Sequence, residues 1–217
     1  MNMQSVMHSL PLVAGVLGKK YGVKVVVGGS SAYTDGTTIH LPSLPAEGTD
    51  TQLGLVRGYL DHESAHIRET DFGVLKQLGV TPLKKHIWNI LEDWRVENAL
   101  ATRFPGCRSN FNSLITHTFA GKKKLSDDIG TRLLSYILLS VRSWDVAAVA
   151  VNRDKVRRGL TGYPLEEIDV VLAESRSNCS SSADCMEYAE KLLAIMVKYS
   201  APEPKESAKS ATTPKDA

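Results

Sequence analysis

Residues 53–66 read LGLVRGYLDHESAH, and this stretch decides the fold. Its apolar residues recur at helical rather than strand spacing, so we expect one helix from Leu53 to Arg68. Four residues apart on such a helix, His62 and His66 lie one turn above each other on the same face. Because their ring nitrogens can then bind a single ion, the sequence predicts a metal site on this helix.

Glu63 follows the first of the two histidines and is expected to point beside the metal rather than at it. A carboxylate in that place can take a proton from a water that the metal activates and pass it to a leaving amine. We therefore predict Glu63 as the general base of a metal-assisted hydrolysis. The structural alternative is an ordinary polar helix surface without metal.

A third metal ligand has to come from another part of the chain, because a catalytic zinc ion commonly takes three protein ligands and one water. The next helix signal begins at Thr81, a good N-cap followed by Pro82, and continues to about Phe104. Three acidic residues interrupt its otherwise apolar pattern: Glu92, Asp93 and Glu97. Buried carboxylates are costly unless they are paired or bind metal, so at least one of them is expected to serve the site.

The spacing of the three acids does not decide between them, because apolar residues flank both candidate faces of the helix. We predict Glu92 as the ligand, with Asp93 and Glu97 as neighbours that orient a histidine ring or pair with Arg95. Glu97 is the alternative ligand. A solvated face of acids and arginine without metal is the remaining interpretation.

Two short segments before the metal-binding helix predict a small antiparallel hairpin, at residues 23–28 and 37–41. A strand beside such a helix can hold an extended peptide through backbone pairing, and Thr38, Ile39 and His40 are the candidates for this role. An ordinary edge strand ended by Pro42 is the alternative. The predicted fold class is α+β, mostly helical, with a small antiparallel sheet or hairpin beside the metal-binding helix.

Length and composition favour one globular domain. The 217 residues are 42% hydrophobic and 23% charged, and we assign residues 1–200 to the domain. A single helical pattern is expected over residues 127–151, and a serine-rich loop over residues 174–182 before a last helix capped by Ser182. Residues 201–217 lack an apolar face and predict a disordered tail or linker.

Charge, hydropathy and cysteine usage exclude several other classes. A net charge of +2 argues against a nucleic-acid partner, and no apolar run approaches the roughly 18 residues of a membrane span. The N-terminus has no Lys or Arg before its apolar part, whereas a secretory signal has a positively charged segment there. Three cysteines without a CxxC pair favour a reducing compartment, so we expect a cytoplasmic protein.

The motif at residues 61–66, DHESAH, with a later glutamate-bearing helix, resembles the gluzincin branch of zinc peptidases, whose ligands are two His and one Glu. Together with residues 70–72, TDF, and residues 91–97, LEDWRVE, it is similar to the metallopeptidase domain of proteins related to the cobaltochelatase T subunit. The likeness covers residues 37–104. It implies a zincin-like fold, bound Zn²⁺ and a peptidase acting on a protein or peptide.

In that family a von Willebrand factor A domain often follows, and the sequence ends at Ala217 without one. We therefore expect that such a domain was lost or is supplied by a partner chain. The rival function is an inactive interaction module in a chelatase-like or remodelling assembly. Glu63 favours the enzyme, because a purely structural zinc site has no use for it.

Overall fold

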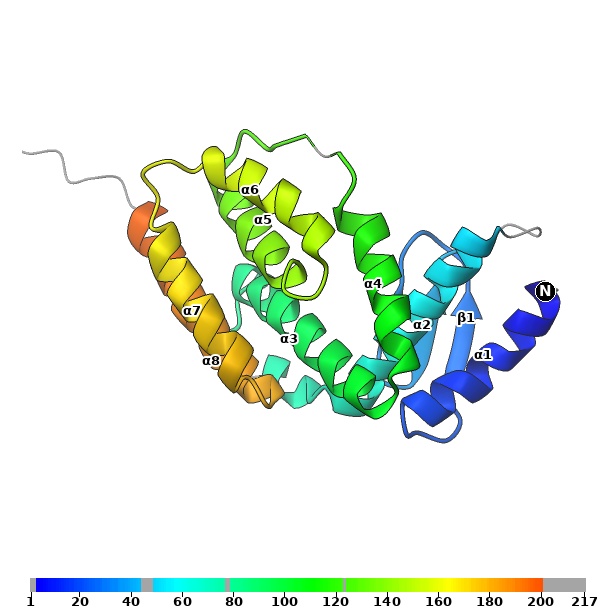
Figure 1. Cartoon of the computed structure of the whole chain (residues 1–217). Coiled ribbons are helices and arrows are strands. Elements are labelled where there is room, and N and C mark those ends of the chain that lie inside the picture. The colour runs from blue at the N-terminus through cyan, green and yellow to red at the C-terminus, as the bar shows by residue number, and fades with distance from the viewer. Residues whose placement is uncertain (1–2, 44–48, 77–78, 123, 201–217) are drawn as a thin grey trace, which may run out of the picture.

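The computed structural model describes residues 3–43, 49–76, 79–122 and 124–200. Within these residues the chain forms a mostly helical α+β fold with eight α-helices and one three-stranded sheet (Figure 1). This confirms the predicted fold class. The predicted tail, residues 201–217, lies outside the described residues.

Helix α2 (Asp50–Glu69) is the predicted metal-binding helix. A capping box fixes its start: the Thr49 hydroxyl accepts a hydrogen bond from the backbone N–H of Gln52, whose side chain accepts one from the N–H of Thr49. Leu53 and Leu60 pack with the sheet in one apolar cluster, whereas Ala65 belongs to the larger core. Helix α2 therefore joins the two apolar clusters of the fold.

The sheet packs against α1 (Met3–Leu17) and α2 and has the strand order β1-β3-β2. Strand β1 (Lys24–Val27) pairs in parallel with β3 (Thr38–Leu41), which pairs antiparallel with β2 (Tyr33–Thr34). The sheet is therefore mixed rather than antiparallel. The turn at Asp35-Gly36 joins β2 to β3, so it does not join the two predicted strands, which are β1 and β3. Strand β2 has only two residues and is too short to be evident from spacing.

Six helices follow α2, and short 3₁₀ segments at Phe72–Lys76 and Ala147–Val149 lie between them. Their bounds are α3 (Pro82–Arg103), α4 (Gly106–Phe119), α5 (Ile129–Arg142), α6 (Ala150–Arg158), α7 (Leu165–Asn178) and α8 (Ser182–Ser200). Thr81 caps α3 with Pro82 in its first turn, as predicted. The helix expected over residues 127–151 ends at Arg142, and most of the loop expected over residues 174–182 is helical.

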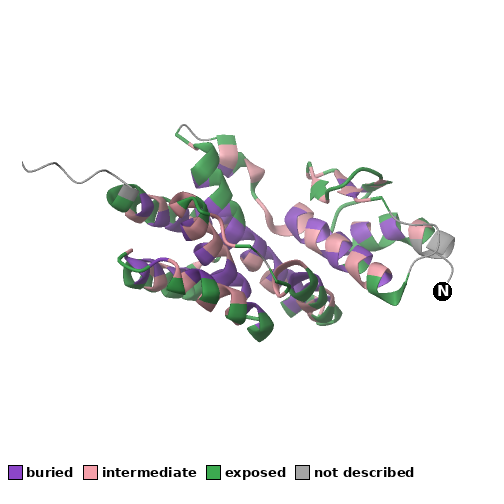
Figure 2. Cartoon of the chain, turned by 90° about the horizontal axis from the view of Figure 1, so that it is seen from above, coloured by how far each residue is buried: buried purple, intermediate pink, exposed green. Residues whose placement is uncertain are grey.

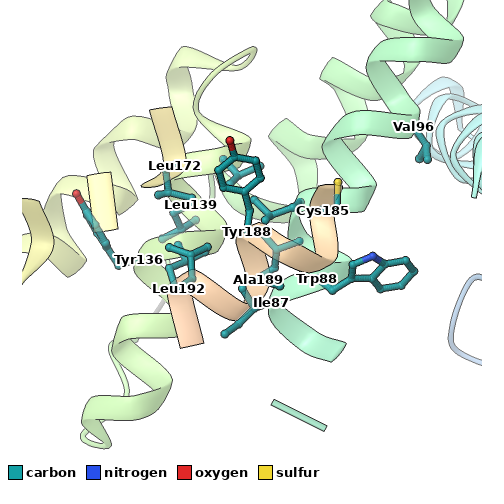
Figure 3. Close-up of a cluster of buried hydrophobic side chains, with 14 of the residues drawn as sticks. Ile87, Trp88, Val96, Tyr136, Leu139, Leu172, Cys185, Tyr188, Ala189 and Leu192 are labelled. Atoms are coloured by element: carbon teal, nitrogen blue, oxygen red, sulfur yellow. The ribbon is translucent and has the colours of Figure 1, made fainter. Parts of the chain in front are cut away.

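Helix α3 runs through the larger core, between the end of the molecule with the sheet and the end with α7 and α8 (Figure 1). Figure 3 shows Ile87 and Trp88 of α3 beside Ala189 and Leu192 of α8, with Tyr136 of α5 nearby. Buried residues lie on the inner faces of these helices and exposed ones on the outer faces (Figure 2). Among the described helices, none combines the length and apolar character that a membrane crossing requires.

Gly58 allows α2 and α4 to approach each other closely. A Cβ atom at this position would lie 2.9 Å from Leu114 Cβ and 3.1 Å from the Asn110 carbonyl oxygen. Gly58→Ala should therefore lower the free energy of unfolding by about 1–3 kcal/mol, despite the better helix propensity of alanine. Gly54 lies on the same helix, and a Cβ atom there would meet open space. Gly54→Ala should therefore leave the free energy of unfolding unchanged or raise it. Chemical denaturation checks both variants, and equal stability for the two would contradict the close packing.

Candidate metal centre

Helices α2 and α3 bring His62, His66 and Asp93 together. Their candidate ligand atoms all lie within 4.8 Å of one another. Asp93 Oδ1 is 3.2 Å from His66 Nε2 and 4.0 Å from His62 Nε2. The two imidazole rings stand almost perpendicular, at 84°. These three side chains could hold one metal ion.

The remaining ring nitrogens are already engaged. His62 Nδ1 lies 2.8 Å from Glu97 Oε1, and His66 Nδ1 lies 2.9 Å from Thr70 Oγ1. With Nδ1–H donated to these oxygens, each neutral ring turns the lone pair of Nε2 toward Asp93. Asp93 Oδ1 is itself buried and makes no hydrogen bond to any described residue. Three acceptor atoms facing one another suit a divalent cation.

Arg142 of α5 balances the charge of this group. Its guanidinium is buried and donates hydrogen bonds to Asp93 Oδ2 and Glu97 Oε2, each at 2.7 Å. Burial alone would raise the pKa of both carboxyls, but Arg142 and the neighbouring histidines lower the pKa of each below its ordinary value. Asp93 and Glu97 are therefore ionised, and each turns its other oxygen toward a histidine.

Glu92, the ligand predicted from the sequence, does not join this group. Its side chain is fully buried and forms a two-point ion pair with Arg95, at 2.9 and 2.6 Å. Burial would raise the pKa of Glu92, but Arg95 lowers it. The structure thus groups Asp93, rather than Glu92, with the two histidines, and Glu97 Oε1 lies at His62 Nδ1.

Glu63 lies beside the group and not in it. Only 4% of the residue is exposed. Burial raises the pKa of Glu63, and the nearby His62 and His66 only partly offset this. Glu63, His62, His66 and Asp93 line a cavity of about 370 Å³, so the carboxylate can reach a molecule bound there.

The same cavity is bordered by Tyr33 and Thr34 of β2, not by the predicted substrate strand. Thr38, Ile39 and His40 belong to β3, which is paired on one side with β1 and on the other with β2. Since its backbone groups are used within the sheet, β3 cannot pair with a peptide along its length. The edge strand next to the metal group is β2.

The bond to Glu97 gives His62 an unusual proton affinity in the metal-free protein. Burial alone would lower the pKa of His62, but the hydrogen bond to Glu97 and the charges of Asp93 and Glu97 raise it to about 9. A metal must therefore displace a proton at neutral pH, and its affinity should rise at least about tenfold per pH unit between about pH 6 and 8.

Titration with Zn²⁺ in non-coordinating buffers at several pH values measures this slope. Glu97→Gln removes the negative charge of Glu97 beside His62 and so lowers the pKa of His62. For this variant the rise of zinc affinity with pH should flatten above about pH 7. A wild-type affinity that is the same across the range would contradict the raised pKa.

Arg142, Thr70 and Ser182 are the site residues that sequence reasoning missed. Arg142 carried a readable signal, because it continues the apolar pattern of α5 as a single charge on the buried side. Thr70 directly follows the end of α2, and Ser182 was seen only as a helix cap. The contacts of Thr70 and Ser182 to Glu92 depend on how three helices meet, and the spacing of residues within one helix does not reveal this.

The fold and the metal group define the class of the chain: an α+β domain with a His-Glu-x-x-His helix and a potential metal site at its contact with the next helix. The family described as cobalamin biosynthesis protein CobT matches residues 4–129, more than half of the chain. The chain belongs to this family, which supports the resemblance to proteins related to the cobaltochelatase T subunit. No curated protein and no solved structure shows a significant match.

Proposed function

We propose that the chain is a zinc-dependent peptidase domain. The observation that carries this proposal is Glu63: a buried carboxylate with a raised pKa, in the same cavity as His62, His66 and Asp93. Two imidazoles and one carboxylate form a ligand set typical of catalytic zinc. A site with only a structural role would not leave such a group beside the metal.

A zinc ion held by His62, His66 and Asp93 would polarise a substrate carbonyl and make a nearby water more acidic. Glu63 takes the proton from this water and delivers it to the amine that leaves when the peptide bond breaks. Its raised pKa suits both steps, because the carboxylate is a stronger base than usual and its acid form still gives up the proton. Glu97 holds the ring of His62 through Nδ1 during the reaction.

The border of the cavity supports an extended peptide as substrate. Tyr33 and Thr34 form an edge strand there, and such an edge can add a peptide by backbone hydrogen bonds. Phe72, Leu75 and Trp88 add apolar lining to the same cavity. These apolar residues would receive side chains of the bound peptide.

The family match favours a second candidate function. The family is described as a cobalamin biosynthesis protein, and the matched residues include all of α2 and α3. The chain could therefore act without hydrolysis, as a metal-containing or metal-free module of a chelatase-like assembly, with a partner that carries a von Willebrand factor A domain. A domain can keep a fold without keeping the chemistry that other proteins perform with it. A measurement of peptide hydrolysis therefore decides between the two functions.

The test is hydrolysis of an unfolded protein, with the fragments identified by mass spectrometry. The proposal predicts new peptide ends that disappear after treatment with a zinc chelator and return when Zn²⁺ is restored. Protein that binds zinc and yields no fragments from unfolded proteins or a mixed peptide library would overturn the peptidase and favour the assembly module.

A further inference from the structure

Glu92 lies behind the metal group at the meeting point of three segments. Its Oε1 atom accepts hydrogen bonds from Arg95 Nη2 at 2.6 Å, from Thr70 Oγ1 at 2.9 Å and from Ser182 Oγ at 2.7 Å. The residue is 0% exposed. This carboxylate is therefore fixed in position by α3, by the end of α2 and by the start of α8.

Thr70 links this carboxylate to a candidate metal ligand. Its hydroxyl oxygen lies 2.9 Å from His66 Nδ1, on the opposite side from the metal group. A hydroxyl has one hydrogen, which goes to Glu92, because a carboxylate paired with arginine offers only acceptor atoms. The hydroxyl oxygen then accepts from His66 Nδ1–H, so the lone pair of Nε2 faces the metal group.

Ser182 connects the arrangement to the C-terminal helices. Its hydroxyl donates to Glu92 and accepts from the backbone N–H of Asp71 at 2.9 Å. Its carbonyl oxygen accepts from Trp88 Nε1 at 3.0 Å. Ser182 is also the first residue of α8, so the positive end of the helix dipole lies near the carboxylate of Glu92.

We propose that Thr70, Glu92 and Ser182 act as a positioning relay for His66, through which α8 sets the metal affinity of the site. This proposal rests on the metal site of the proposed function but not on hydrolysis. It extends the site beyond the residues of the family match, which ends at residue 129. Partners that orient a ligating histidine typically change metal affinity about 10–100-fold.

The experiment compares Thr70→Val, which keeps the shape and loses the hydroxyl, with Thr70→Ser, which keeps the hydroxyl. Thr116→Val is the matched control, because its hydroxyl bonds only to a carbonyl within α4. Ser182→Ala is paired with Ser177→Ala, whose hydroxyl bonds within α7. For each full-length chain, the Zn²⁺ dissociation constant is measured by competition with a chromogenic chelator, and thermal melting is measured without metal.

The relay predicts about 10–100-fold weaker Zn²⁺ binding for Thr70→Val and for Ser182→Ala, with near wild-type binding for Thr70→Ser and both controls. The Co²⁺ absorption spectrum of Thr70→Val should also change, since the ring of His66 is no longer held. A merely structural role would lower the melting temperature of the metal-free protein and leave affinity and spectrum unchanged, which would overturn the relay.

The outcomes separate this proposal from the proposed function. Wild-type affinity in Thr70→Val overturns the relay alone. The expected loss of affinity in a protein that cleaves nothing supports the relay and overturns only the peptidase. A wild-type chain that binds neither Zn²⁺ nor Co²⁺ overturns both.

Discussion

Replacing Glu63 with glutamine should lower peptide cleavage by about 10²–10⁴-fold while the metal stays bound. The amide keeps the size of the side chain but cannot accept the proton of the attacking water. Glu63 lies outside the three candidate ligands, so its loss removes no ligand atom. The measurement is the initial rate of fragment formation by wild type and variant at equal metal content.

Glu69→Gln is the matched control for this prediction. It removes a carboxylate from the end of the same helix, where Glu69 makes a partly exposed ion pair with Arg68 at 3.3 Å. Its rate should match that of the wild type, since pairs of this kind contribute little. Equal rates for Glu63→Gln and wild type would refute the general base and leave the assembly module as the better function.

Asp93→Asn is expected to have the second large effect, on metal affinity rather than on rate. The amide has nearly the same shape but lacks the negative charge that faces both Nε2 atoms. The loss should exceed the roughly 10–100-fold change typical of residues that only orient a ligand. Zinc titration with a competing chelator gives the dissociation constants, and melting of the metal-free variant reports on its fold.

Glu92→Gln distinguishes the two neighbouring acids. Glu92 is buried and paired like Asp93, but its contacts lead to His66 only through Thr70. We expect a smaller loss of zinc affinity than for Asp93→Asn. The reverse order, with binding abolished in Glu92→Gln and kept in Asp93→Asn, would restore Glu92 as the third ligand.

The sequence predicted the part of the site that lies on one helix, but it did not decide which residue of the next helix joins it. His62, Glu63 and His66 share one helix, so their relative placement follows from helix geometry alone. The third member depends on which face of α3 turns toward α2. Glu92 and Asp93 are adjacent residues about 100° apart around the axis, and apolar residues surround both.

Buried Arg142 settles that rotation in the structure. Because its guanidinium must be paired, it draws Asp93 and Glu97, four residues apart on one face, to the same side of α3. Glu92 then points away from this group and accepts hydrogen bonds from Arg95 and from Ser182 at the start of α8. A pairing across helices of this kind has no fixed spacing in the chain, which is why the sequence alone could not choose.

The fold shows the same division between local and distant contacts. The capped start of α3 follows from Thr81-Pro82 and was predicted. The parallel pairing of β1 with β3 depends on strand β2, which has only two residues and carries little pattern. The loop expected at residues 174–182 is mostly helix because Leu172 and Ser175 are buried against the core, outweighing the low helix propensity of serine.

The metal content of the purified chain tests the central claim most directly. We predict close to one zinc per chain by plasma mass spectrometry after incubation with Zn²⁺ and gel filtration, kept in Glu63→Gln and lost in His62→Ala. His86→Ala, which removes an exposed histidine of α3, should keep its zinc. No bound metal in the wild type after zinc is supplied, or the same content in His62→Ala, would contradict a metal centre at His62, His66 and Asp93.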